Sequence, residues 1–190
     1  MTLTRLFLAA TLAMSFAGTM ARAQETNSYP KSNLELFEAM TSVVIIRGTD
    51  EAGVVIGKIG GVTLRCRESR DPGTNRRESG VIVTVTQVEG LEDTTVVDYD
   101  ELDGLIRGIN YISNVDWSVT SLSHFEAGFT TRSGFKVASF SSRRSGTIEA
   151  FALSNRLIRS RSALTMAQLA QLRVYLEQAK AKLDVVQKAK

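Results

Sequence analysis

The sequence has little of the chemistry that metal and catalytic sites use. Its 190 residues include one cysteine, Cys66, and one histidine, His124. A single cysteine cannot form the disulfide framework of a small secreted scaffold. One Cys and one His also exclude zinc sites built from those ligands, because such sites take several of them. A Ser-His-Asp triad would have to use His124, and no G-x-S-x-G motif supplies its serine. The sequence therefore predicts no catalytic residue, no metal ion and no cofactor.

Cys66 and His124 both have ordinary structural explanations. Cys66 alternates with Val62 and Leu64, a spacing typical of the buried face of a strand. We therefore expect a small buried apolar residue there. The alternative is a thiol activated by the arginines on either side, but alternation places those arginines on the opposite face. For His124 we expect a place on the polar face of a strand, with a catalytic role as the alternative.

No long hydrophobic run follows residue 23, so we expect no segment that spans a membrane. Near the N-terminus an uncharged run covers residues 6–17, which is shorter than the roughly 20 residues that a bilayer requires. Arg5 precedes this run, and Ala21 and Ala23 follow it at the positions that a signal peptidase reads. We therefore predict a signal peptide over residues 1–23, cleaved after Ala23. The alternative is a buried N-terminal helix.

Export follows from this prediction, and so does a change in the charge of the chain. We expect a soluble, periplasmic or extracellular bacterial protein. No cysteine directly follows the uncharged run, which excludes a lipid anchor on an N-terminal cysteine. Cleavage would remove Arg5 and Arg22 but no acidic residue, so the net charge falls from +3 to +1. Overall basicity is therefore no guide to function, and it does not favour nucleic acid as a partner.

The charges are separated along the chain. Residues 89–103 carry seven acidic residues and no basic one, whereas residues 132–161 carry seven basic residues and one acidic one. Such a basic segment favours an anionic partner, such as a polysaccharide or a phosphate head group. The alternative is that the two segments lie side by side and neutralise each other. The candidate anion-binding residues are Arg132, Lys136, Arg143, Arg144, Arg156, Arg159 and Arg161.

The acidic segment has some likeness to a calcium-binding loop that starts at Asp98. The spacing is wrong, because Leu102 stands at the fifth position and Asp103 at the sixth, where the loop requires glycine. We expect these acids to cap a helix and to solvate a turn, with Asp98 or Asp100 as the cap. Weak surface binding of calcium is the alternative.

Alternation and turn residues predict an antiparallel sheet structure. Gly60 and Gly61 between two apolar runs are typical of a tight hairpin. Residues 24–31 are polar and predict a mobile lead, and residues 43–47 form a short β-branched run before a turn at 48–51. The predicted strands cover residues 53–59, 62–68, 80–88, 94–98, 118–132, 135–141 and 147–154.

Local signals predict two helices before the last strands. Ser32 and Glu35 fit a capping box, which predicts a short helix over residues 33–40. Its predicted apolar face is Leu34, Phe37 and Met40. A second helix is predicted over residues 100–113 from apolar spacings of three and four. Gly104 and Gly108 weaken it by about 1 kcal/mol each, and they favour the close approach of another element.

The C-terminal helix has the clearest signals. Thr165 and Gln168 form a capping box, and Leu164 and Leu169 stand at the positions of a hydrophobic staple. We expect a helix over residues 166–185 that docks on the sheet, with a coiled-coil seam as the alternative. Its apolar stripe is Leu169, Leu172, Leu176, Ala179 and Leu183.

These elements predict one α+β domain over residues 32–190. Four strands precede the helix at 100–113, and three strands and the C-terminal helix follow it. This order resembles the pleckstrin-homology-like superfold, which implies a largely antiparallel two-sheet partial barrel or roll in which the helix at 100–113 is an insertion. A single twisted sheet with helices on one face is the alternative. The resemblance covers element order alone, and it assigns no functional residue.

The first functional hypothesis is an exported, non-enzymatic binding or accessory protein whose partner is an anionic ligand or another protein. The second is a hydrolase built from dispersed Ser, Asp and His residues. The third is an envelope assembly protein that uses the stripe of the C-terminal helix.

Overall fold

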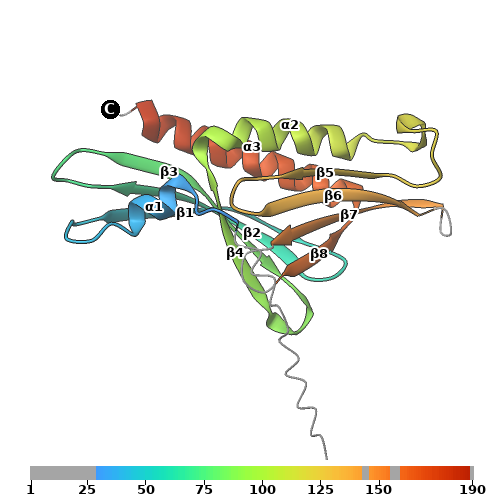
Figure 1. Cartoon of the computed structure of the whole chain (residues 1–190), viewed down its shortest axis with the longest axis horizontal. Coiled ribbons are helices and arrows are strands. Elements are labelled where there is room, and N and C mark those ends of the chain that lie inside the picture. Colours follow the sequence, from blue (N-terminus) through green and yellow to red (C-terminus); the bar gives the residue numbers. More distant parts are fainter. Residues whose placement is uncertain (1–28, 143–145, 155–158, 189–190) are drawn as a thin grey trace, which may run out of the picture.

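The computed structural model describes residues 29–142, 146–154 and 159–188 (Figure 1). The predicted signal peptide and most of the predicted lead lie outside these residues. The described part has the α+β composition predicted from the sequence, with two four-stranded antiparallel sheets. Sheet A consists of β1 (Ile46–Ile56), β2 (Gly61–Arg70), β3 (Arg77–Thr86) and β4 (Glu92–Asp98). Sheet B consists of β5 (Glu126–Thr130), β6 (Phe135–Ser142), β7 (Thr147–Ser154) and β8 (Ser160–Leu164).

Three α-helices accompany the sheets: α1 (Asn33–Glu38), α2 (Leu102–Ser113) and α3 (Met166–Lys188). Each sheet is a simple meander, and each is followed in the chain by a helix. The helices cross over, so that α3 packs on β1 and β2 while α2 packs on β5 and β6. They lie side by side over one face of the two sheets, whereas α1 covers the opposite face of sheet A (Figure 1).

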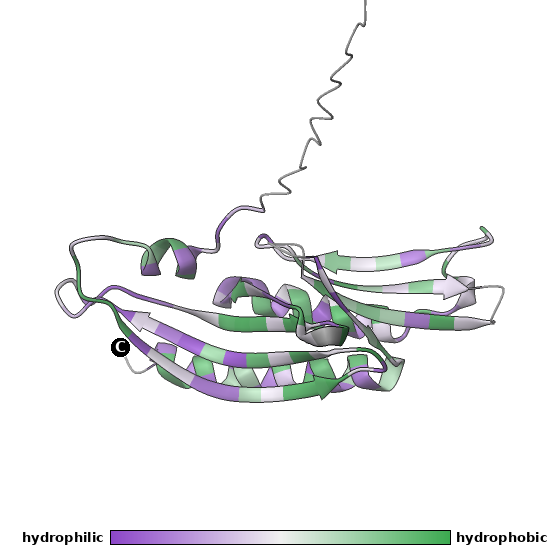
Figure 2. Cartoon of the chain, turned by 90° about the horizontal axis from the view of Figure 1, so that it is seen from below, coloured by the Kyte–Doolittle hydropathy of each residue, from purple (hydrophilic) through white to green (hydrophobic). Residues whose placement is uncertain are grey.

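One continuous core joins the two halves. The strand residues that point toward the helices are apolar, and their polar neighbours point outward, which Figure 2 shows as alternating colours along the strands. Cys66 belongs to this buried face, as predicted. All five residues of the α3 stripe are at most 2% exposed, so the predicted docking of this helix is confirmed. The other sides of the core come from Leu102, Leu105, Ile109, Ile112, Phe135, Val137, Ala150, Ala152 and Leu164.

Both predicted capping boxes form. The Ser32 hydroxyl accepts the Glu35 backbone N–H at 3.1 Å, and the Glu35 carboxylate accepts the Ser32 N–H at 2.8 Å. At α3, the Thr165 hydroxyl accepts the Gln168 N–H at 3.1 Å, and the Gln168 side chain accepts the Thr165 N–H at 2.7 Å. These reciprocal bonds satisfy N–H groups that have no partner inside the helix, and they fix where each helix begins.

The glycines of α2 allow close packing, as predicted, and the neighbour is an aromatic ring. Phe129 of β5 lies over Gly108 so closely that a Cβ atom there would stand 2.6 Å from its ring. At Gly104 an added Cβ would lie 3.5 Å from the same ring, which is ordinary contact. The pair therefore sets the distance between α2 and the first strand of sheet B.

Some sequence predictions were wrong at the ends of the elements. The predicted turn at residues 48–51 lies inside β1, where a bulge between Glu51 and Gly53 absorbs the extra residue. The predicted strand over residues 118–132 begins only at Glu126. Met40 lies beyond the end of α1 and is 41% exposed, so it does not extend the apolar face of that helix.

A fourth strand follows the α2 helix, where three were predicted. This strand, β8, has little apolar content of its own, and its partners explain why it forms. It pairs with β7, and its Ala163 also bridges the β1–β2 turn, donating to the Ile59 carbonyl at 3.0 Å. The Ala163 carbonyl accepts the Lys58 N–H at 2.8 Å, which ties sheet A to the edge of sheet B.

Candidate functional site

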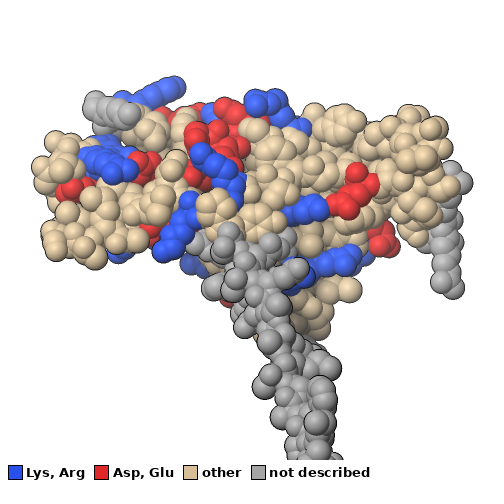
Figure 3. Space-filling model, viewed as in Figure 1, with Lys and Arg blue, Asp and Glu red and all other residues tan. Residues whose placement is uncertain are grey.

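The predicted anion-binding residue Arg132 has its charge matched by the acidic segment. Its Nη2 atom lies 3.3 Å from Asp98 and 2.6 Å from Asp100, and its Nε atom lies 3.3 Å from Glu101. Figure 3 shows basic and acidic side chains next to each other across this face. At this position the structure matches the alternative in which the two segments neutralise each other.

The other candidates are divided between several places. Lys136 lies 2.5 Å from the Glu126 carboxylate, and the guanidinium of Arg161 stacks 3.4 Å above the ring of Phe151. Arg159 is exposed, with a φ of 51°. Within the described ranges, neither Arg159 nor Arg161 has a carboxylate partner. The remaining candidates lie outside the described residues: Arg143, Arg144 and Arg156.

The described residues bring together no catalytic or metal constellation. His124 is exposed and precedes β5, so the prediction that it lies on a strand was wrong. Cys66 is buried, and burial raises the pKa of its thiol. No three His, Cys, Asp or Glu side chains converge in this part of the chain as a metal ion would need.

The free edge of β5 is the first component of a candidate binding surface. The described part of sheet B ends with this strand, which pairs on one side with β6. Ser141 and Thr131 donate to the carbonyls of Phe125 and Phe135, which identifies the hydrogen-bonded pairs of the β5–β6 ladder. Because these pairs alternate, the backbone groups of the intervening β5 residues point away from β6. Those residues, all exposed, are Glu126, Gly128 and Thr130.

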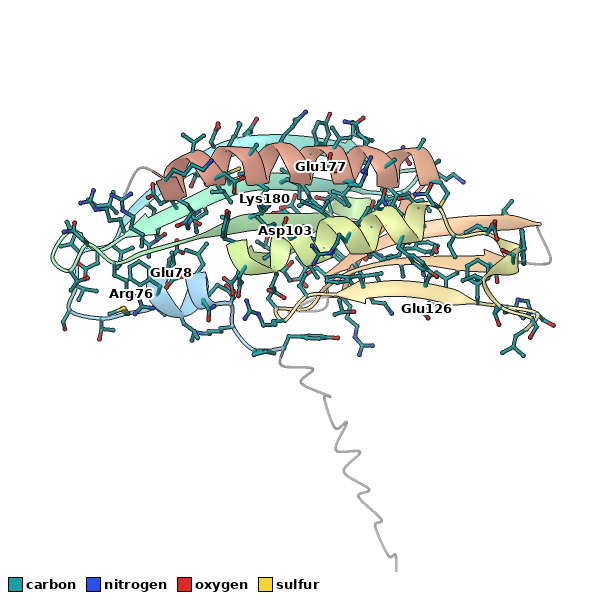
Figure 4. All side chains as sticks on the ribbon, turned by 90° about the horizontal axis from the view of Figure 1, so that it is seen from above. Arg76, Glu78, Asp103, Glu126, Glu177 and Lys180 are labelled. Carbon is teal, nitrogen blue, oxygen red and sulfur yellow. The ribbon has the colours of Figure 1, made fainter. Side chains whose placement is uncertain are left out.

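A groove runs between this edge and α2. The two elements lie side by side and run in opposite directions (Figure 1), and Figure 4 shows the position of Glu126 on β5. The groove contains a cavity of about 430 Å³. Its largely apolar lining includes the side of β5 that carries Ala127 and Phe129. Its lining residues are Gly108, Tyr111, Ile112, Val119, Glu126, Ala127, Gly128 and Phe129.

A second cavity, of about 370 Å³, continues the groove beyond the end of α2. It shares Tyr111 and Val119 with the first cavity. Tyr111 is 63% exposed and the nearby Trp117 is 40% exposed, and Trp117 meets Phe125 edge to face with ring centres 6.0 Å apart. The remaining lining of this second cavity is Asn110, Asn114, Val115, Asp116 and Ser118.

The other half of the molecule has an equivalent groove between β1 and α3, with Cys66 on its lining. There the edge strand is partly covered. The Lys182 amine binds the Asp50 carboxylate at 2.5 Å and the Glu51 carbonyl at 2.7 Å, so the side chain crosses β1. Of the two grooves, the one along β5 therefore has the more accessible backbone.

No protein-family model, curated protein or solved structure matches this chain. Among the helices that the structure describes, none has the length and hydropathy that a membrane crossing requires. One sequence signal that would have directed attention to the β5 groove is the absence of Lys and Arg from residues 108–131.

Proposed function

We propose that this protein is an exported, non-enzymatic accessory protein that binds an extended segment of a partner protein along β5. The observation that carries the proposal is the combination of a free strand edge with an apolar groove beside it. Edge strands commonly recognise peptides by adding a strand, because backbone hydrogen bonds supply affinity and side-chain pockets supply specificity. Export rests on the signal peptide expected over residues 1–23.

The geometry also defines the pattern of the bound segment. Residues of an added strand that pair with Ala127 and Phe129 would face α2 and the cavity, because side chains alternate across a sheet. Their neighbours would face outward, next to Glu126 and Thr130. The partner segment therefore alternates apolar and polar residues, with the apolar ones in the groove.

Gly128 provides a test with a matched control. Its N–H points away from β6, so Gly128→Pro removes a donor for an added strand without removing a bond of the β5–β6 ladder. Gly128→Ala keeps the donor, and its Cβ would meet the flexible end of Lys136 at 3.1 Å. A library of 12-residue peptides would be selected against the wild-type chain. We expect the selected peptides to bind the Ala variant within about twofold of wild type and the Pro variant at least about tenfold more weakly.

Two outcomes would contradict the proposal. One is a selection that yields no alternating peptides, and the other is equal binding to the Pro and Ala variants. Circular dichroism of both variants would show that sheet B is intact, so that lost binding is attributable to the edge.

The alternatives from the sequence have less support. The α3 stripe packs inside the molecule, so an assembly role would need another surface. A hydrolase would need His124 near a serine and an acid, and the described residues give it no such hydrogen bond. Of the described candidates for an anionic partner, Arg159 and Arg161 are the two without a carboxylate partner. The pleckstrin-homology-like partial barrel remains a proposal about the fold.

A further inference from the structure

The cavity at the end of α2 has a chemical character of its own. Polar residues make up most of its lining, and they include Asp116, Asn110 and Asn114. Asn114 donates its amide N–H to the Asn110 carbonyl at 2.7 Å, which leaves the Asn114 side-chain oxygen as an acceptor. Among the described residues, no lysine or arginine lines this cavity.

The Asp116 carboxylate is fixed in place and remains ionised at neutral pH. Its Oδ1 atom accepts the Ser118 backbone N–H at 2.7 Å and the Ser118 hydroxyl at 2.5 Å. These bonds hold the pKa of Asp116 below its usual range. Within the described residues, Asp116 forms no ion pair, so its charge is available to a bound group. Arg107 lies about one turn before Tyr111 on α2, and it does not line the cavity.

Two further features favour a positive charge in this place. The cavity lies at the C-terminal end of α2, where the helix dipole leaves a partial negative charge, and the last turn of this helix has no basic residue. Tyr111, which is largely exposed, lines the cavity. Trp117 follows Asp116 in the sequence and is 40% exposed, but it is not one of the lining residues. Aromatic faces attract ammonium and guanidinium groups.

We infer that this cavity binds a lysine or arginine side chain of the partner segment, just beyond the residues that pair with β5. The inference rests on the proposed function, because the added strand carries the cation to the cavity. The two cavities share Tyr111 and Val119, so a continuous segment reaches both. The recognised sequence is then an alternating apolar segment with a basic residue at one end.

Asp116→Asn is the informative variant. Asparagine is as good a helix cap as aspartate, so the variant keeps the bond to Ser118 and removes only the charge. Asp103→Asn is the matched control, because it removes the same charge at the other end of α2. The full-length chain and both variants would be used in selections from the same library of 12-residue peptides.

We expect wild type and Asp103→Asn to select alternating peptides with Lys or Arg at one fixed position, and Asp116→Asn to lose that position while keeping the alternation. A peptide selected by wild type would then be compared with its Lys→Gln form. That change should weaken binding to the wild-type protein about two- to tenfold, and the effect should be larger at low salt than at high salt. It should weaken binding to the Asp116→Asn variant by less than about twofold. Alternating peptides that bind through Gly128 without a basic position would overturn this inference alone. A selection without alternating peptides would overturn the proposed function and this inference together.

Discussion

The buried carboxylate of Asp98 accepts the backbone N–H of Asn33 at 2.7 Å, across 65 residues of sequence. Its second oxygen accepts the Leu34 N–H at 3.0 Å, so this side chain at the end of β4 caps α1. Arg132, in the β5–β6 turn, lies 3.3 Å from the same carboxylate. One residue thereby joins α1, sheet A and sheet B.

Removing this side chain should destabilise the fold. Asp98→Ala leaves two backbone donors of α1 without their partner and removes a buried charge beside Arg132, so we expect a loss of about 2–4 kcal/mol in the free energy of unfolding. Asp100→Ala removes an exposed partner of the same arginine and should cost less than about 1 kcal/mol. Urea unfolding followed by circular dichroism measures both. Equal losses would mean that Asp98 acts only through Arg132.

Local sequence rules predicted a different role for Asp98, as a cap for the helix that follows it. In the structure, neither Asp98 nor Asp100 makes a side-chain cap to that helix. A capping rule compares residues two or three apart, whereas the N–H groups that Asp98 satisfies belong to α1. The chemistry of the residue was predicted correctly, but its partner depends on the tertiary fold.

The two glycines of α2 should respond to alanine with opposite signs. At Gly108 the added Cβ would stand 2.6 Å from the Phe129 ring, so ring and helix must separate and we expect a loss of about 1–3 kcal/mol. At Gly104 the Cβ has ordinary contact, and better helix propensity should stabilise the protein by up to about 1 kcal/mol. Thermal unfolding of the two variants tests this. Changes of the same sign would show that Phe129 does not fix the spacing.

Helices were predicted better than strands because their signals are local. Both capping boxes and the α3 stripe lie within a few residues of the structure they determine. In contrast, β8 has little apolar content, and its contacts are a ladder with β7 and the bonds of Ala163 to the β1–β2 turn about a hundred residues earlier. For the first part of β1 the local pattern predicts a turn, since Gly48 and Asp50 are turn residues and nothing local indicates that β2 pairs with them.

Glu38 should make stability depend on pH. Burial raises the pKa of its carboxyl, but hydrogen bonds from Ser69 and Arg67 and the charges of Arg67 and Arg47 outweigh this and lower it overall. A carboxyl with a lower pKa in the folded state binds fewer protons there than in the unfolded chain. Its contribution is therefore complete above the unfolded value of about 4.3 and is lost as pH falls through the folded value.

We expect Glu38→Gln to reduce this pH dependence. Urea midpoints would be measured between pH 6 and pH 3 for the variant, for wild type and for Glu177→Gln, which removes one charge from an exposed pair on α3. Glu38→Gln should lower stability at pH 6 and approach wild type at the acid end. A constant difference between the two proteins across the range would contradict a role for ionisation.

The candidate site was only partly foreseen from the sequence. The charge pattern drew attention to the basic segment, but Arg132 and Lys136 are occupied by Asp98 and Glu126. The groove depends on which edge of sheet B remains open, and strand order is not visible in alternation. The sequence did contain one indication, because Tyr111 and Trp117 are aromatic residues in a segment without lysine or arginine.

The thiol of Cys66 should report on the integrity of the fold. It lies on the inner face of β2, where Sγ contacts the Ala179 carbonyl of α3 at 3.6 Å. Burial raises the pKa of the thiol, and the smaller effects are those of Lys182, which lowers it, and Asp50, which raises it, so little reactive thiolate is present at pH 8. We expect Ellman's reagent to label the native protein at least about a hundredfold more slowly than the urea-unfolded protein, because labelling requires α3 to separate from the sheet.

Labelling rates would be measured across the urea transition, together with circular dichroism, and the two should change in the same range of urea. Lys182→Ala removes the side chain that crosses β1 without removing an apolar residue of the core, so it should leave most of the protection in place. Rapid labelling of the wild-type thiol without urea would show that the groove between β1 and α3 opens independently of global unfolding.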